Sequence, residues 1–74
     1  MRKTYHVAAF WDPEAKVWVS KSDLPGLVIE TATLGEFEAL IRGLAPELIA
    51  ANEGPHIEAD IEWTARGVVS LEAA

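Results

Sequence analysis

The alternation of apolar and polar side chains begins close to the N-terminus. From Thr4 to Trp11 the alternate positions form two sets, and both sets are largely apolar. The first set is Tyr5, Val7, Ala9 and Trp11, and the second is His6, Ala8 and Phe10. Side chains on a strand alternate between the two faces of a sheet, so this pattern predicts a strand in the centre of a sheet, with a helix over one face.

Two turn signals follow and divide the first half of the chain into three strands. Asp12 and Pro13 open the sequence DPEAK, where the fixed φ of proline favours a type I or II turn. Asp23 begins the sequence DLPG, where Pro25 and Gly26 provide a second reversal. The segments VWVSKS and LVIET, which lie between and after these turns, are predicted as the second and third strands. The first half of the chain is therefore expected to form a three-stranded antiparallel meander.

A helical pattern replaces the alternation after Thr33. Thr33 and Glu36 have the spacing of a capping box, which marks a helix N-terminus. Gly43 and Pro46 predict a kink or a break, with Pro46 suited to begin a short second helical turn, and the sequence NEGP ends the helix. The apolar positions recur at helical intervals, at Leu34, Phe37, Leu40, Ile41, Leu44 and Leu48.

The sequence HIEADIEW returns to strict alternation and predicts a fourth strand. Its polar side carries Glu58, Asp60 and Glu62, which we call the acidic row. Unpaired carboxylates are costly to bury, so the strand is expected at a sheet edge, with its acids in solvent or against a partner. A right-handed crossover through the helix returns this strand parallel to the first. The predicted class is α+β, in the order βββαβ, and the segment from Thr64 to Ala74 is expected to finish the strand or to fray.

Length and composition limit the function classes. The 74 residues are expected to form one domain, 1–74, and so short a chain buries only about 60% of its unfolded surface. We therefore expect it to self-associate, as a homodimer or larger oligomer, through apolar sheet surface. The absence of cysteine excludes disulfides and thiolate metal clusters. No apolar run is long enough to cross a membrane, and the net charge of -6 repels nucleic-acid phosphates. We therefore expect a cytoplasmic protein that binds neither membrane nor nucleic acid directly.

Few side chains in the sequence are candidates for catalysis or metal binding. Asp12 and Glu14 are close enough in sequence to share a proton or a metal ion, but no third ligand is near, and turn chemistry explains Asp12. His6 and His56 would approach each other if the first and fourth strands were neighbours, but no carboxylate spacing completes a metal site.

Nucleophilic catalysis has no better support, because the serines occupy no nucleophile-elbow pattern. They are Ser20, Ser22 and Ser70. The sequence thus predicts no catalytic residues, no metal and no cofactor.

Two features suit partner binding better than chemistry. The acidic row is a candidate docking surface for lysine or arginine side chains, which would add association rate and specificity. Trp11 and Trp18 flank the first turn, and the sequence indicates no certain cross-strand pair between them. They are expected to pack in the core or in an interface, where exposed aromatic area would supply affinity.

The stretch AAFWDPEAKVWVSKSDLPGLVIETATLGEFEALI, followed by APELI, resembles the HicB-like antitoxin domain, in particular its short bacterial branch catalogued as a domain of unknown function. The resemblance runs from Val7 to roughly Asn52 and is most specific in the two turns and the helix entry. It implies a βββαβ fold similar to part of the ribonuclease H architecture. It also implies a partner, a small basic toxin that cleaves messenger RNA and whose active site the antitoxin covers.

This chain departs from full-length members of that family. They usually carry a C-terminal DNA-binding segment, and here only Thr64 to Ala74 follow the last strand, so operator binding is not expected. The first strand also lacks the acids that hold magnesium in ribonuclease H enzymes, so catalysis does not follow from the fold. Two alternatives to the antitoxin remain, an orphan self-associating accessory domain and a small-ligand binder with a pocket around Trp11 and Trp18.

Overall fold

The strands and the helix follow one another in the predicted order. In a computed structural model, which describes residues 2–72, the elements are β1 (Arg2–Asp12), β2 (Val17–Ser22), β3 (Glu30–Thr31), α1 (Leu34–Glu53) and β4 (Glu58–Arg66). The sheet order is β3-β2-β1-β4, in which β1 is antiparallel to β2 and parallel to β4. The α+β class, the central β1 and the edge position of β4 are therefore confirmed.

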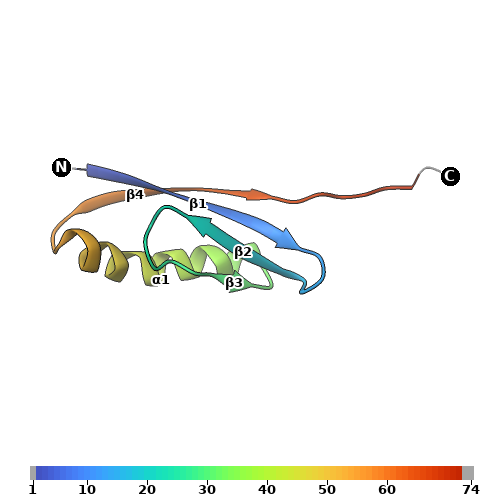
Figure 1. The fold of residues 1–74 in the computed structure, drawn as a ribbon, viewed down its shortest axis with the longest axis horizontal. Coiled ribbons are helices and arrows are strands. Elements are labelled where there is room, and N and C mark those ends of the chain that lie inside the picture. The colour runs from blue at the N-terminus through green and yellow to red at the C-terminus, as the bar shows by residue number, and fades with distance from the viewer. Residues whose placement is uncertain (1, 73–74) are drawn as a thin grey trace.

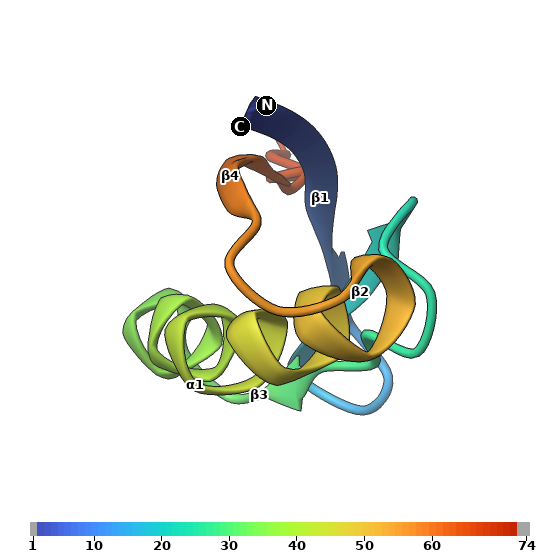
Figure 2. The same ribbon diagram turned by 90° about the vertical axis from the view of Figure 1, so that its left-hand side faces the viewer.

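The core lies between the sheet and α1, which covers one face (Figures 1 and 2). One of the two predicted sets on β1 supplies the sheet side of this core, and the loop before β3 closes its end. No helix among the described residues covers the other face of the sheet, and Phe10 on that face is 38% exposed. The buried apolar residues are Tyr5, Val7, Ala9, Leu24, Leu27, Ile29, Phe37, Ile41, Ala45 and Ile49.

The helix begins as predicted but does not break at Pro46. The Thr33 hydroxyl accepts a hydrogen bond from the Glu36 amide at 3.1 Å, and α1 then continues through Pro46 to Glu53. Proline removes only one hydrogen bond from the helix, whereas the turns beyond it bury Ile49 in the core. The glycine that ends α1, Gly54, has a φ of 92° and donates its amide to the last turn.

The third strand is shorter than predicted, because a side chain replaces part of its ladder. The Ser20 amide donates to the Ile29 carbonyl at 3.0 Å, while the Ser20 hydroxyl accepts from the Ile29 amide at 2.8 Å. This exchange leaves regular pairing only at Glu30 and Thr31. Leu27 and Ile29 are nevertheless buried, so the segment serves the core that its pattern predicts.

The fourth strand is shifted towards the C-terminus relative to its predicted position. It starts at Glu58 because His56 has a φ of 66°, outside the strand region. It ends at Arg66, opposite Phe10 of β1. The described residues after it, 67–72, which we call the tail segment, continue in an extended path beyond the sheet (Figure 1) and give the molecule a length of 56 Å. Ala73 and Ala74 lie outside the described residues.

Candidate functional site

The two tryptophans of the first hairpin contact each other directly. Trp11 and Trp18 are partners in the β1–β2 register, and their ring centroids lie 5.3 Å apart at an interplanar angle of 58°. Sequence reasoning assigned no certain pair here because the register depends on the turn. Lys16 adopts a φ of 57° and donates its amide to the Asp12 carbonyl at 2.7 Å, which closes the turn.

Asp12 is occupied by its own turn. Its Oδ1 accepts hydrogen bonds from the amides of Glu14 at 3.0 Å and Ala15 at 3.3 Å. Glu14 therefore contacts Asp12 through its backbone amide. Among residues 2–72, no group of three or more histidine or acidic side chains is arranged to hold a metal.

The acidic row lies along the sheet edge with its side chains exposed, and two of its three members bind an arginine of the same chain. Arg2 donates from Nε to Asp60 Oδ2 at 2.7 Å and from Nη2 to Asp60 Oδ1 at 2.8 Å. It also donates from Nη1 to Glu58 Oε2 at 3.0 Å. The hydrogen bonds from Arg2 lower the pKa of the Asp60 carboxyl and raise the pKa of the guanidinium. The row therefore presents less free negative charge than its sequence suggests.

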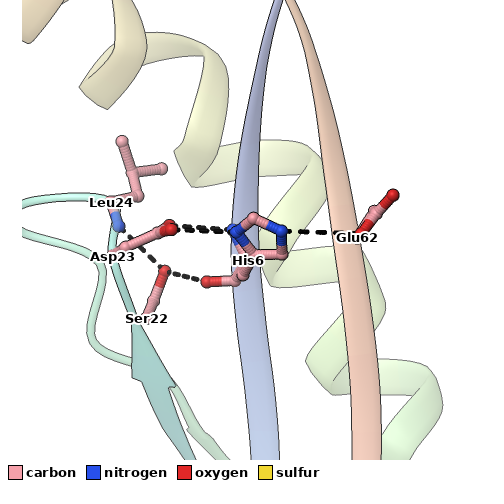
Figure 3. A network of polar contacts seen from close by, with 5 residues as sticks. All are labelled: His6, Ser22, Asp23, Leu24 and Glu62. Atoms are coloured by element: carbon pink, nitrogen blue, oxygen red, sulfur yellow. Dashed lines mark hydrogen bonds and ion pairs between the residues drawn. The ribbon is translucent and has the colours of Figure 1, made fainter.

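The third member, Glu62, belongs to a network centred on His6 (Figure 3). Asp23 reaches His6 twice, since its Oδ1 accepts from the His6 amide at 2.8 Å and its Oδ2 lies 3.0 Å from Nδ1. On the other side of the ring, Nε2 lies 3.5 Å from Glu62 Oε2. The Ser22 hydroxyl donates to the His6 carbonyl at 2.8 Å and accepts from the Leu24 amide at 3.0 Å. One imidazole thus links β1, the end of β2 and β4.

The network shifts the pKa values of His6 and Asp23 but does not form a catalytic arrangement. Its hydrogen bond with Asp23 raises the pKa of His6 above its ordinary value, and the hydrogen bond from the His6 amide lowers the pKa of Asp23. Because the Ser22 hydroxyl points to a carbonyl and not to the imidazole, these residues do not form a nucleophile and base pair. The predicted approach of His6 to His56 is wrong, because the parallel register puts Glu62 beside His6.

A second ionic contact ties the end of α1 to β1. Glu53 accepts hydrogen bonds from the Lys3 ammonium group and from the Tyr5 hydroxyl, the latter at 3.1 Å. The contact with Lys3 lowers the pKa of Glu53, and Lys3 also lies 5.2 Å from the centre of the Tyr5 ring. These residues hold the last turn of α1 against the sheet, and the charges of Lys3 and Glu53 are paired with each other.

A groove lined by both apolar and charged side chains runs between β4 and the helix. It has a volume of about 380 Å³, and we call it the α1–β4 groove. Trp63 lines this groove and stacks on Phe37, with ring centroids 5.8 Å apart. Glu38, Arg42 and Asp60 line the groove as charged groups, so it has mixed polarity. The apolar lining consists of Ile41, Ala45, Pro46, Ile49, Ala59, Ile61 and Trp63.

A second hollow, of about 480 Å³, lies where β4 passes the end of the hairpin, and we call it the end hollow. It includes Trp11, as the sequence predicted for a ligand pocket, but not Trp18, which packs against the core. Arg66 is its only charged lining residue. The lining is Phe10, Trp11, Pro13, Arg66, Gly67 and Val68.

Together these features define a small two-layer α+β protein with an open sheet edge, a charged row on that edge and a groove of mixed polarity beside it. No helix within residues 2–72 has the length and apolarity needed to span a membrane. The chain belongs to the family described as "Domain of unknown function (DUF1902)", whose model matches residues 4–70.

A solved relative has the same fold. It is the crystal structure of a hypothetical protein from the extremely thermophilic bacterium Thermus thermophilus, which is 39% identical and superposes with a TM-score of 0.69. The match covers 95% of this chain and 99% of that one. A search of curated proteins found no match. The family and the relative thus establish kinship without naming an activity.

Proposed function

We propose that this protein is a HicB-like binding module of the antitoxin type, which captures a small basic toxin that cleaves messenger RNA. The observation that carries the proposal is the edge strand β4, whose outer side is unpaired in the four-stranded sheet. A partner can add a strand there, with backbone hydrogen bonds for affinity and side-chain contacts for specificity. Messenger RNA is cleaved in the cytoplasm, so we expect the protein to act in that compartment.

The side chains of β4 suit a basic and partly apolar partner. The acidic row is exposed, with Glu58 at 78%, Asp60 at 50% and Glu62 at 72% side-chain exposure. Beside the same strand, the α1–β4 groove offers both apolar and charged groups for contact. A net charge of -6 adds long-range attraction for a basic protein.

Arg2 must be displaced when a basic side chain engages the row. Its side chain is 57% exposed, and exposed ion pairs contribute little free energy in water. An exchange of Arg2 for a lysine or arginine of the partner therefore costs little. It follows that Arg2→Ala frees Glu58 and Asp60, and we expect it to strengthen capture of the toxin.

The test begins with the neighbouring reading frame in the host genome, which must encode a short basic protein with a catalytic histidine. That protein is titrated by calorimetry at low and high salt, and its ribonuclease activity is measured with and without this chain. Glu58→Lys combined with Asp60→Lys is expected to weaken binding about tenfold or more at low salt. The matched control, Glu14→Lys with Glu47→Lys, makes the same change of net charge away from β4.

Three results contradict the proposal. The first is a genome with no such neighbour, and the second is an affinity at low salt that the β4 substitutions leave unchanged. The third is an equal loss in the control variant, which would mean that net charge alone and not the row attracts the partner. The second candidate function, a self-associating accessory domain, is favoured by a separate surface, the tail segment.

A further inference from the structure

The tail segment carries apolar side chains that nothing in residues 2–72 covers. Val68, Val69 and Leu71 are 86%, 82% and 87% exposed. The segment is extended and continues the line of β4 past the end of the sheet (Figure 1). The family model matches as far as residue 70, so most of this segment belongs to the domain that the family shares. An extended strand with free backbone groups and apolar side chains is a template for pairing with another strand.

Two charged residues frame this segment. Arg66 ends β4 and Glu72 is the last described residue, and both are exposed. Neither takes part in an ion pair within the part of the chain that the structure describes. Val69 lies midway between them in the sequence. If two copies of the segment pair antiparallel about Val69, Arg66 of each copy lies directly opposite Glu72 of the other.

The same register brings apolar groups together on the opposite face. Side chains alternate along a strand, so Val69 and Leu71 share a face with Gly67. Leu71 of the second copy then lies opposite Gly67, where a Cβ would be 3.6 Å from the ring of Trp18. Because glycine has no side chain, the leucine has access to that indole and to the neighbouring end hollow.

We infer that the tail segment is a self-association surface whose partner is a second copy of this chain. Residues 66–72 of the two copies form an antiparallel ribbon about a twofold axis at Val69. A two-stranded ribbon alone is marginally stable, so the packing of Leu71 near Trp18 and the two Arg66–Glu72 ion pairs complete the contact. The pairing of residues 66–72 lies beyond the acidic row, which ends at Glu62, and it stands independently of the proposed toxin.

The absence of cysteine makes a direct test available. With Val69 opposite its own copy, Val69→Cys places two Cα atoms about 4.5 to 5.5 Å apart, within disulfide range. Val68→Cys is the matched control, because two residues of stagger separate its Cα atoms by about 8 Å, beyond that range. Under mild oxidation, Val69→Cys is expected to form a linked dimer at least about tenfold faster than Val68→Cys.

A charge exchange tests the same register without a covalent bond. Arg66→Glu and Glu72→Arg each oppose like charges at two places in the dimer, so each alone is expected to raise the dissociation constant about tenfold or more in analytical ultracentrifugation. The double variant Arg66→Glu, Glu72→Arg restores both pairs and is expected to restore the dimer. Arg42→Glu and Glu47→Arg change the net charge equally on α1 and serve as controls.

Arg42, Glu47, Arg66 and Glu72 are all exposed, so the charge reversals are expected to keep the fold. Circular dichroism of each variant checks this. Wild-type protein that sediments as a monomer at about 100 µM overturns the inference, whether or not a toxin binds. Equal cross-linking of the two cysteine variants overturns the register, as does a dimer that either single charge reversal leaves intact. If the tail segment binds a different protein instead, the purified chain sediments as a monomer, and this result also overturns the inference.

Discussion

The contact between the two hairpin tryptophans has an energy that a double-mutant cycle can measure. A tilted pair with centroids 5.3 Å apart is expected to contribute about 0.5 to 1.5 kcal/mol beyond the burial of each ring. Trp18 also packs against the core, so Trp18→Ala is expected to cost about 3 kcal/mol, the lower end of the range for a fully buried tryptophan. Trp11 lies outside that cluster, and Trp11→Ala is expected to cost about 1 to 2 kcal/mol. The free energy of unfolding lost in the double variant should be smaller than the sum of the two single losses, and the difference is the coupling energy.

Urea unfolding followed by far-ultraviolet circular dichroism gives each free energy without relying on the indoles that are removed. The control cycle combines Trp11→Ala with Trp63→Ala. Trp63 lies beside Val7, four residues and about 13 Å along β1 from Trp11, so its coupling should stay below about 0.5 kcal/mol. A Trp11–Trp18 coupling no larger than this control would refute the assigned register of the hairpin.

Two further predictions concern pH and the second turn. The pKa of His6 is raised in the folded protein, so His6 stabilises the fold at pH values below its ordinary pKa of 6.5, and this stability is lost as the pH rises through the raised pKa. The pKa of Asp23 is lowered, so Asp23 stabilises the fold at pH values above its ordinary pKa of 3.8, and this stability is lost as the pH falls through the lowered pKa. His6→Gln should therefore remove the alkaline decline in urea midpoint, and identical pH profiles for the variant and wild type would contradict the network. Gly26 has a φ of 88°, and a Cβ there would lie 3.0 Å from Leu48 Cδ2, so Gly26→Ala should cost about 1 to 2 kcal/mol by the same unfolding assay. A cost near zero would mean that the turn relaxes to another conformation.

The features that the sequence predicts correctly are those fixed by local chemistry. A run that is apolar on both alternate sets assigns β1, strict alternation assigns β4, and two proline turns separate the strands of the meander. The edge position of β4 follows from its three acids, because their burial would be costly. Thr33 likewise marks the start of α1, since its hydroxyl caps the amide of Glu36.

The contacts that the sequence does not predict depend on register between distant segments. Arg2 and Asp60 are 58 positions apart and meet only because β1 and β4 are parallel in one particular register. His6 meets Asp23 because the antiparallel register that pairs Val7 with Ser22 continues by one position, and local signals do not specify that register. The uninterrupted helix at Pro46 is a third case, in which tertiary packing outweighs the local preference of proline.

The length of β4 allows the two proposed contacts to coexist. The acidic row ends at Glu62, while the self-pairing contact is centred on Val69 and its ion pairs are formed by Arg66 and Glu72. Antiparallel pairing about Val69 directs the two sheets away from each other, which leaves each acidic row at a distal end of the dimer. A single straight strand thus has room for one contact with a different protein and one with its own copy. This arrangement gives a physical reason for an extended tail in a chain whose core ends earlier.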